Sequence, residues 1–311
     1  MEFSHVPIML TECIDNLNIN PDGVYVDATL GGAGHSSEIA KRLSSKGTLI
    51  GIDKDKTAIE VSRERLSKFN CNIILVNDDY KNLLDILKEN NIEKIDGLLA
   101  DLGVSSYQLD EASRGFSYSK DAPLDMRMNQ NQSLTAHTVV NTYSEKDLLK
   151  ILYEYGEENF AKSIVRNILK AREEKQIQTT GELVKIIEKS VPSKLLHKGG
   201  SVAKKTFQAI RIEVNNELEN LKSVLNDMIT CLKPKGRLCI ITFHSLEDRL
   251  VKNCFNDNSA GCICPKTLPI CVCNHKPIIN LINKKPILPS DFELKNNSRS
   301  TSSKLRVAEK L

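Results

Sequence analysis

A Gly-rich segment could hold a nucleotide-like cofactor. Residues 31–34, Gly-Gly-Ala-Gly, directly follow the apolar run VYVDATL (24–30) and precede a helical pattern. Glycines at the carboxyl end of a strand let the backbone approach a ligand closely, and the helix that follows directs its first amides at it. The order of residues matches neither G-x-G-x-x-G nor a P-loop. The segment therefore indicates a nucleotide-type cofactor, with a tight turn of no function as the alternative.

Polar side chains follow the next apolar runs at positions that suit the same cofactor. Asp53 ends Ile-Gly-Ile-Asp about twenty residues after the Gly-rich turn, where a carboxylate accepts hydrogen bonds from ribose hydroxyls. Asp55 directly precedes a helical pattern and is better placed as a helix cap. Tyr80 follows the third run, and its ring suits either the face of an adenine or the core.

A long polar stretch begins where the fourth apolar run ends. It contains DLGVSSYQLD (101–110), RGFSY (114–118) and PLDMRM (123–128). A turn needs far fewer residues, so this stretch predicts an active-site loop.

Alternating strands and helices would bring these segments to one edge of a sheet. We expect buried strands at 24–30, 48–55, 71–78, 95–103 and 238–243. We expect helices between them at 36–43, 56–68 and 80–90, and one after the last strand at 246–255. This order predicts an α/β fold with a Rossmann-like parallel sheet.

Residues 133–232 show helical periodicity and no convincing strand. Apolar residues from Phe207 to Leu232 repeat every three or four positions, which predicts one long helix leading back to the sheet. Shorter helices are expected at 145–155, 158–172 and 181–190. We therefore divide the chain into a first core part (1–132), a helical insertion domain (133–215) and a second core part with a basic C-terminal segment (216–311).

The ordered set of motifs resembles the RsmH (MraW) family, whose members methylate cytosine N4 in small-subunit ribosomal RNA. The fourth-strand signature carries most of the resemblance. Further motifs that match are HVPIML (5–10), DATLGGAGHS (27–36), FQAIRIEVNNEL (207–218), FHSLEDR (243–249) and SSKLRVAEK (302–310). The resemblance covers essentially the whole chain and implies a class I methyltransferase sheet with S-adenosylmethionine as cofactor.

The resemblance also assigns site residues. The residues that it implies for cofactor binding are Ala33, Gly34, His35, Asp53, Tyr80, Asp101 and Gln108. Two of the departures from the family pattern lie at or beside these positions. Ala33 stands where glycine is common, which costs little if its φ is negative. Tyr107 replaces a proline and makes the loop before Gln108 less rigid.

Methyl transfer to an exocyclic amine needs an in-line approach and an acceptor for the amine proton. We expect Asp101 to be that acceptor, with His244 and Asp125 as weaker alternatives. No cysteine nucleophile is needed. A target cytosine must be unpaired or flipped out of a duplex. The two rival hypotheses are an NAD-dependent dehydrogenase and a non-catalytic RNA-binding module. The dehydrogenase is a rival because an acid at the position of Asp53 beside a Gly-rich turn also occurs in NAD sites.

Charge and composition restrict the partners and the compartment. The net charge is only +3, but the last segment, residues 295–311, holds five basic residues and one acid. We expect a basic tail there, either solvated or in contact with 16S rRNA. Positive charge in the insertion comes from Lys198, Lys204, Lys205 and Arg211. The sequence contains no signal peptide or membrane span, which predicts a cytoplasmic protein. The resemblance implies 16S rRNA as the partner, with free rRNA and the assembled small ribosomal subunit both open as the substrate. The sequence neither predicts nor excludes a homodimer.

Nine cysteines without a secretion signal are expected to be reduced. Two pairs, Cys262-x-Cys264 and Cys271-x-Cys273, could bind zinc together with the nearby His275. Because the C-x-C spacing is outside the usual C-x₂₋₄-C pattern, we favour a metal-free loop and expect no metal ligand.

Overall fold

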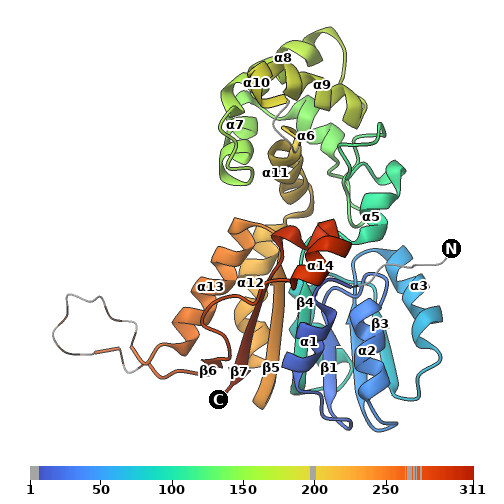
Figure 1. Cartoon of the computed structure of the whole chain (residues 1–311), viewed down its shortest axis with the longest axis vertical. Coiled ribbons are helices and arrows are strands. Elements are labelled where there is room, and N and C mark those ends of the chain that lie inside the picture. The colour runs from blue at the N-terminus through green and yellow to red at the C-terminus, as the bar shows by residue number, and fades with distance from the viewer. Residues whose placement is uncertain are drawn as a thin grey trace. The chain divides into compact units, whose positions relative to one another are not determined.

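The computed structural model describes residues 7–196, 201–262, 264, 268, 270, 272, 273 and 275–311. The chain forms two compact units (Figure 1). One contains the residues up to Gly103 and those from Leu218 to the end, and the other contains Val104–Glu217. His5, Lys198 and Cys271, named in the motifs above, lie outside the described residues.

The first unit contains a seven-stranded sheet in the order β3-β2-β1-β4-β5-β7-β6. Strands β1 to β5 are parallel, and β7 is antiparallel to both of its neighbours. The strands are β1 (Val24–Asp27), β2 (Thr48–Ile52), β3 (Asn72–Val76), β4 (Ile95–Asp101), β5 (Leu232–Thr242), β6 (Ile279–Leu281) and β7 (Lys304–Lys310). The predicted Rossmann-like methyltransferase sheet is confirmed. Its strand order reverses between β1 and β4, where ligands of doubly wound folds bind.

Helices cover both faces of this sheet (Figure 1). The helices of the first unit are α1 (Leu10–Leu17), α2 (Gly34–Arg42), α3 (Lys56–Leu66), α4 (Leu83–Glu89), α12 (Glu217–Thr230), α13 (Ser245–Ser259) and α14 (Asp291–Asn296). Short 3-10 helices span Tyr80–Asn82 and Ser298–Ser302. Alternation along each strand separates the two cores, because Leu98 and Ala100 pack with α4, α12 and α13 while Leu99 packs with α1, α2 and α3.

The second unit is helical in all its described regular elements apart from one isolated β-bridge. Its α-helices are α5 (Ser106–Asp110), α6 (Ala136–Thr142), α7 (Glu145–Glu154), α8 (Ala161–Glu174), α9 (Thr180–Ser190), α10 (Ser193–Leu196) and α11 (Lys204–Asn215). The sequence analysis divided the chain after residue 132. In the structure, the polar stretch belongs to this unit from Val104 onward. Its residues Leu124, Met126 and Met128 are buried with the side chains of α6 and α11.

The expected single helix from Phe207 to Leu232 is wrong. It is two helices, α11 and α12, separated at Asn216, which has a left-handed φ of 51°. Asn215 is buried just before the break, where its side-chain amide donates to the Met126 carbonyl and its oxygen accepts from the Met128 amide. Apolar periodicity continues across Asn216, so the sequence pattern did not reveal the break.

The basic C-terminal segment is not a tail. Leu305 and Val307 are fully buried, and residues 304–310 form β7 inside the sheet. Arg306 is only 8% exposed and its Nε lies 2.6 Å from Oδ1 of Asp248 on α13. At Arg306 the positive charge therefore stabilises the fold. Among the described helices, none is long and apolar enough to cross a bilayer.

Candidate functional site

The turn between β1 and α2 has an unusual backbone. Gly31 and Ala33 both have left-handed φ angles, 50° and 56°. A negative φ, the condition under which alanine would cost little at position 33, is therefore not met. A Cβ on Gly34 would lie 2.3 Å from Cγ of Pro7, so only glycine lets the N-terminal segment cross the turn there. The turn is shaped for a close backbone approach.

Asp53 holds this turn from the end of β2. Its Oδ2 accepts a 2.8 Å hydrogen bond from the Gly31 amide, and its Oδ1 accepts one from the Asp55 amide. Asp55 caps α3 by accepting from the Thr57 amide, as predicted. Burial raises the pKa of Asp53 to about 6, although the two backbone donors oppose the shift. Each oxygen keeps a lone pair, so the carboxylate can accept further hydrogen bonds from a ligand.

Helix α3 fixes the outer side of the same turn. The Ser62 hydroxyl donates to the Gly31 carbonyl and the Arg65 guanidinium donates to the Gly32 carbonyl. These bonds orient the peptide groups of the turn. The turn is therefore preorganised before any ligand binds.

Asp101 ends β4 on the other side of β1. Its backbone amide donates to Oγ1 of Thr29 at 2.6 Å, which ties it to the same turn that Asp53 holds through Gly31. The side chain of Asp101 is 26% exposed, yet its Oδ1 is buried without a hydrogen-bond partner among the described residues. Burial, and then the negative charge of neighbouring acids, raise the pKa of Asp101 well above its usual range.

His35 lies next to Asp101 as a neutral imidazole. Its Nε2 is 3.0 Å from the Ile8 carbonyl, which only accepts, so Nε2 carries the proton and Nδ1 is an acceptor. Burial lowers the pKa of His35, consistent with the neutral form. Nδ1 lies 3.8 Å from Oδ2 of Asp101. Two acceptors facing each other, beside an unpaired oxygen, fit a ligand that brings a hydrogen-bond donor or a positive charge.

Three acids that the sequence analysis did not select strengthen this preference. Asp27, Glu247 and Glu293 each raise the pKa of Asp101 through their charge. Asp27 ends β1 and accepts from the Ser36 hydroxyl at 2.6 Å. The strand-end position was a usable signal for Asp27, but Glu293 comes from α14, and no local pattern indicates where that helix packs.

Tyr80 is placed among core residues of the α4 face and is 9% exposed. Lys54 lies over its ring, 5.7 Å from the centroid, and also pairs with Asp79 at 3.2 Å. Asn220 of α12 donates to the same carboxylate. These contacts agree with the core position, which was one of the two alternatives that the sequence analysis gave for Tyr80. The contact of Tyr80 with adenine stays a prediction.

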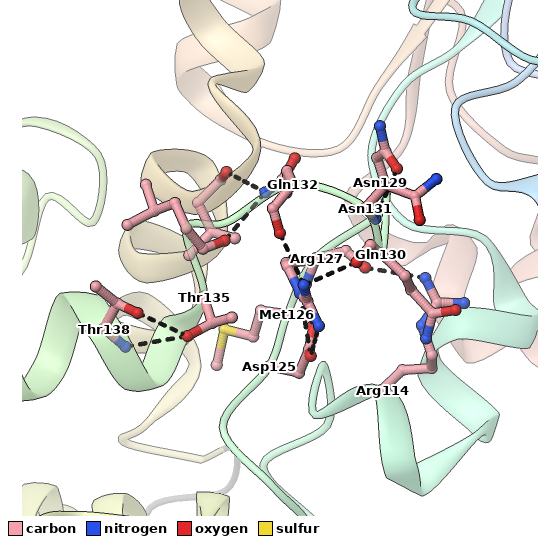
Figure 2. Close-up of polar contacts among 12 residues, drawn as sticks. Arg114, Asp125, Met126, Arg127, Asn129, Gln130, Asn131, Gln132, Thr135 and Thr138 are labelled. Atoms are coloured by element: carbon pink, nitrogen blue, oxygen red, sulfur yellow. Dashed lines mark hydrogen bonds and ion pairs between the residues drawn. The ribbon is translucent and has the colours of Figure 1, made fainter.

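The weaker alternatives to Asp101 are held by structural contacts. His244 is the N-cap of α13, where its Nδ1 accepts from the Glu247 amide in a reciprocal capping box. In the second unit, Figure 2 shows Asp125 facing Arg127, whose Nε and Nη2 donate to the carboxylate at 2.7–3.1 Å. Both carboxylate oxygens of Asp125 are therefore engaged by this guanidinium.

Two further predictions fall in the second unit. Gln108 caps α5 together with Ser105, because its Oε1 accepts from the Ser105 amide. Its contact with the cofactor stays a prediction. Among the basic residues of the insertion, Arg211 pairs with Glu217 at 2.9 Å and Lys205 donates to the Glu157 carbonyl.

The first unit thus offers a Gly-rich turn between two carboxylates, surrounded by further acids. This charge disfavours the pyrophosphate of a dinucleotide and favours a cation such as a sulfonium or an ammonium group. Hydroxyl groups of a ribose suit the remaining lone pairs of Asp53. This set of hydrogen-bond acceptors therefore fits an adenosyl group linked to a sulfonium better than it fits NAD.

Comparison with known proteins agrees with this preference. The family model described as "MraW methylase family" matches residues 2–311. The chain belongs to the MraW methylase family. Relatives from Clostridioides difficile (55% identical over 311 residues) and Clostridium botulinum strain Kyoto (57% over 311 residues) cover the whole of both chains. Both bear the name "Ribosomal RNA small subunit methyltransferase H". The MraW assignment confirms the resemblance seen in the sequence, excludes the dehydrogenase and the non-catalytic module, and makes S-adenosylmethionine the cofactor.

Proposed function

We propose that the protein transfers the methyl group of S-adenosylmethionine to N4 of a decoding-centre cytosine in 16S rRNA, in the cytoplasm. The names of its relatives support the rRNA of the small subunit as substrate. The observation that carries the proposal is the bonding of Asp53 and Asp101 to one turn, through Gly31 and Thr29, at the carboxyl edge of the sheet.

The proposed cofactor contacts follow the edge of this sheet. Asp53 accepts hydrogen bonds from the ribose hydroxyls, and the backbone at Ala33 and Gly34 approaches the methionine moiety. His35 and Asp101 accept from its ammonium group. Tyr80 borders the adenine.

Gln108 is a further proposed cofactor contact. Its role rests on the sequence resemblance.

Asp101 is the proposed proton acceptor. S-adenosylmethionine supplies an electrophilic methyl group. The cytosine amino nitrogen forms the new N–C bond as the S–C bond breaks, and the proton that leaves nitrogen goes to Asp101 and then to water. Its raised pKa makes Asp101 a stronger base than an ordinary aspartate. General-base catalysis is most effective when the pKa of the base lies near the working pH.

The substrate is proposed to be the small ribosomal subunit. Its target cytosine must be unpaired, at a cost of about a few kcal/mol if it starts in a duplex. The homodimer remains a proposal, and sedimentation at the assay concentration separates it from a monomer.

Nucleoside mass spectrometry of 16S rRNA from a deletion strain tests the substrate. We expect N4-methylation of one decoding-centre cytosine to disappear, and to return with the wild-type gene but not with Asp101→Asn. An unchanged modification pattern would overturn the assignment.

A second test uses purified components. Small subunits, free 16S rRNA and large subunits are incubated with labelled S-adenosylmethionine. We expect label in the small-subunit sample alone; label in the large-subunit RNA would contradict the proposed substrate. Stabilisation of the protein by NAD and not by S-adenosylhomocysteine would contradict the proposed cofactor site.

A further inference from the structure

Three cysteines meet between α13 and β6, in the segment for which the sequence favoured a metal-free loop. The sulfur atoms of Cys262, Cys264 and Cys273 all lie within 4.8 Å of one another. Cys262 and Cys273 are eleven positions apart in the chain, yet their Sγ atoms are 3.8 Å apart. Local C-x-C spacing alone does not produce this convergence.

The sulfur separation is that of ligands around one ion. Zinc–sulfur bonds are about 2.3 Å long, and a tetrahedron with this radius has edges of about 3.8 Å. A disulfide would need about 2.05 Å. The Cys262–Cys273 distance of 3.8 Å matches the first geometry and excludes the second for this arrangement.

Backbone amides point at two of the sulfurs. The Cys264 amide donates to Sγ of Cys262, and the Val272 amide donates to Sγ of Cys264, both at 3.4 Å. Such donors stabilise the thiolate, which is the form that binds metal. The C-x-C spacing therefore lets the Cys264 amide donate to the sulfur of Cys262. The short spacing thus favours a metal site here, although it argued against one in the sequence.

The described residues between α13 and β6 include apolar side chains that are largely exposed. Ile270 is 75% exposed and Val272 is 71% exposed, so these apolar side chains form no core. Its ends are tied to α13, where the His275 ring contacts the Asp257 carbonyl and the Ile278 amide donates to the Asn258 carbonyl. A metal link between the cysteines would hold such a segment in one conformation where its described apolar side chains do not.

We propose that Cys262, Cys264 and Cys273 bind one Zn²⁺ ion, which orders the segment between α13 and β6. Thiolates are soft ligands and select zinc among the abundant divalent cations that tolerate tetrahedral geometry. The site is structural, and none of its ligands belongs to the proposed methyl-transfer site. Cys271 lies outside the described residues, and the proposal does not depend on it.

Metal analysis of the full-length protein, purified without chelator, tests the proposal. We expect one zinc per chain by inductively coupled plasma mass spectrometry, and at least a tenfold loss in Cys262→Ser and in Cys273→Ser. Cys254→Ser is the matched control, because this half-buried cysteine of α13 is not in the cluster and should leave the zinc content unchanged. All variants should still bind S-adenosylhomocysteine, which shows that they are folded.

Alkylation of the wild-type protein gives an independent result, even if a variant fails to fold. Iodoacetamide should label Cys262 slowly in the zinc-loaded protein and at least tenfold faster after chelation, since Cys262 is otherwise exposed. Cobalt loading should produce thiolate-to-metal charge-transfer absorption. Metal-free protein after growth in zinc, with labelling of Cys262 indifferent to added zinc, would overturn the proposal. So would a Cys262–Cys273 disulfide in the purified protein.

Discussion

Cofactor affinity should depend on pH through Asp53. Burial raises the pKa of this carboxyl to about 6, so it titrates in a range where few other acids do. Both oxygens already accept one backbone hydrogen bond, from Gly31 and from Asp55. A proton on either oxygen occupies a lone pair and removes the negative charge of the carboxylate. Ribose hydroxyls would donate their hydrogen bonds to that lone pair and that charge. We therefore expect the ionised form to bind the cofactor and the protonated form to bind it poorly.

The magnitude follows from the pKa. If only the ionised form binds, the apparent Kd rises in proportion to the protonated-to-ionised ratio plus one, which is about 11 at pH 5 and about 1 at pH 8 for a pKa of about 6. We expect binding of S-adenosylhomocysteine to weaken about tenfold between pH 8 and pH 5, which is about 1.4 kcal/mol. Asp53→Asn should bind at least tenfold more weakly at pH 8, because its NH₂ group opposes one of the two backbone donors.

Isothermal titration calorimetry with S-adenosylhomocysteine measures this dependence, since the amino acid part of the ligand does not titrate between pH 5 and pH 8. Asp15→Asn, an exposed change on α1, is the control and should keep the wild-type Kd and its pH profile. Asp53→Asn should show a flat profile. Wild-type affinity that is constant from pH 8 to pH 5 would refute the role of Asp53. A tenfold dependence that persists in Asp53→Asn would assign the titration to another group, with Asp101 the first candidate.

The sign for the cofactor-free protein is opposite. Asp53 has a higher pKa in the folded state than the ordinary value of 3.8, so the folded state holds the proton more tightly than the unfolded state. Its contribution to stability is therefore greatest below about pH 4 and is lost as the pH rises through about 6. The bound cofactor compensates for this loss, so the thermal shift caused by S-adenosylhomocysteine should grow from pH 5 to pH 8.

Three further predictions concern single residues. Asp101→Asn should lower the rate of methyl transfer to small subunits by about 100-fold or more, while the Kd for S-adenosylhomocysteine, measured by calorimetry, rises by no more than about tenfold; equal losses in both would make Asp101 a cofactor ligand alone. Ala33→Gly relieves a left-handed alanine and should raise stability by about 1 kcal/mol, or about 2 °C in Tm for a unit of this size; a lower Tm in differential scanning calorimetry would contradict the backbone assignment. Asp248→Asn leaves Arg306, 8% exposed, without its ionised partner and should cost about 3 kcal/mol in urea unfolding, whereas Arg42→Gln, which breaks the exposed pair with Glu38, should cost under about 1 kcal/mol.

The sheet and its edge were predictable because buried parallel strands have a strong sequence signal. Runs such as Leu98–Leu99–Ala100 are apolar at every position, since both faces of the strand are covered. Once the strands are located, the carboxyl ends of neighbouring strands must meet, and this placed Asp53 and Asp101 near one turn. The contact of Asp53 with Gly31 and that of Asp101 with Thr29 follow from the sheet topology more than from any motif.

Other features depend on contacts that no local pattern encodes. Glu293 approaches Asp101 from α14, and the carbonyl that fixes the His35 tautomer belongs to Ile8. The strand β7 was hidden because Arg306 interrupts its apolar alternation, and only the ion pair with Asp248 explains a buried arginine there. In the same way, convergence of Cys262 and Cys273 needs the intervening segment to fold back, which spacing rules do not test.

The acids around Asp101 give the proposed reaction a direction. In the cofactor-free protein, burial and these acids raise the pKa of Asp101, which favours its protonated form. A sulfonium beside Asp101 lowers that pKa, because an opposite charge favours the ionised carboxylate. Once the methyl group has left, the sulfur is neutral and the positive charge is on the cytosine nitrogen. That charge still favours the ionised carboxylate, and it disappears when the proton passes from nitrogen to Asp101. In our proposal, the neighbouring acids favour a cationic cofactor before the transfer and the protonated Asp101 carboxyl after it.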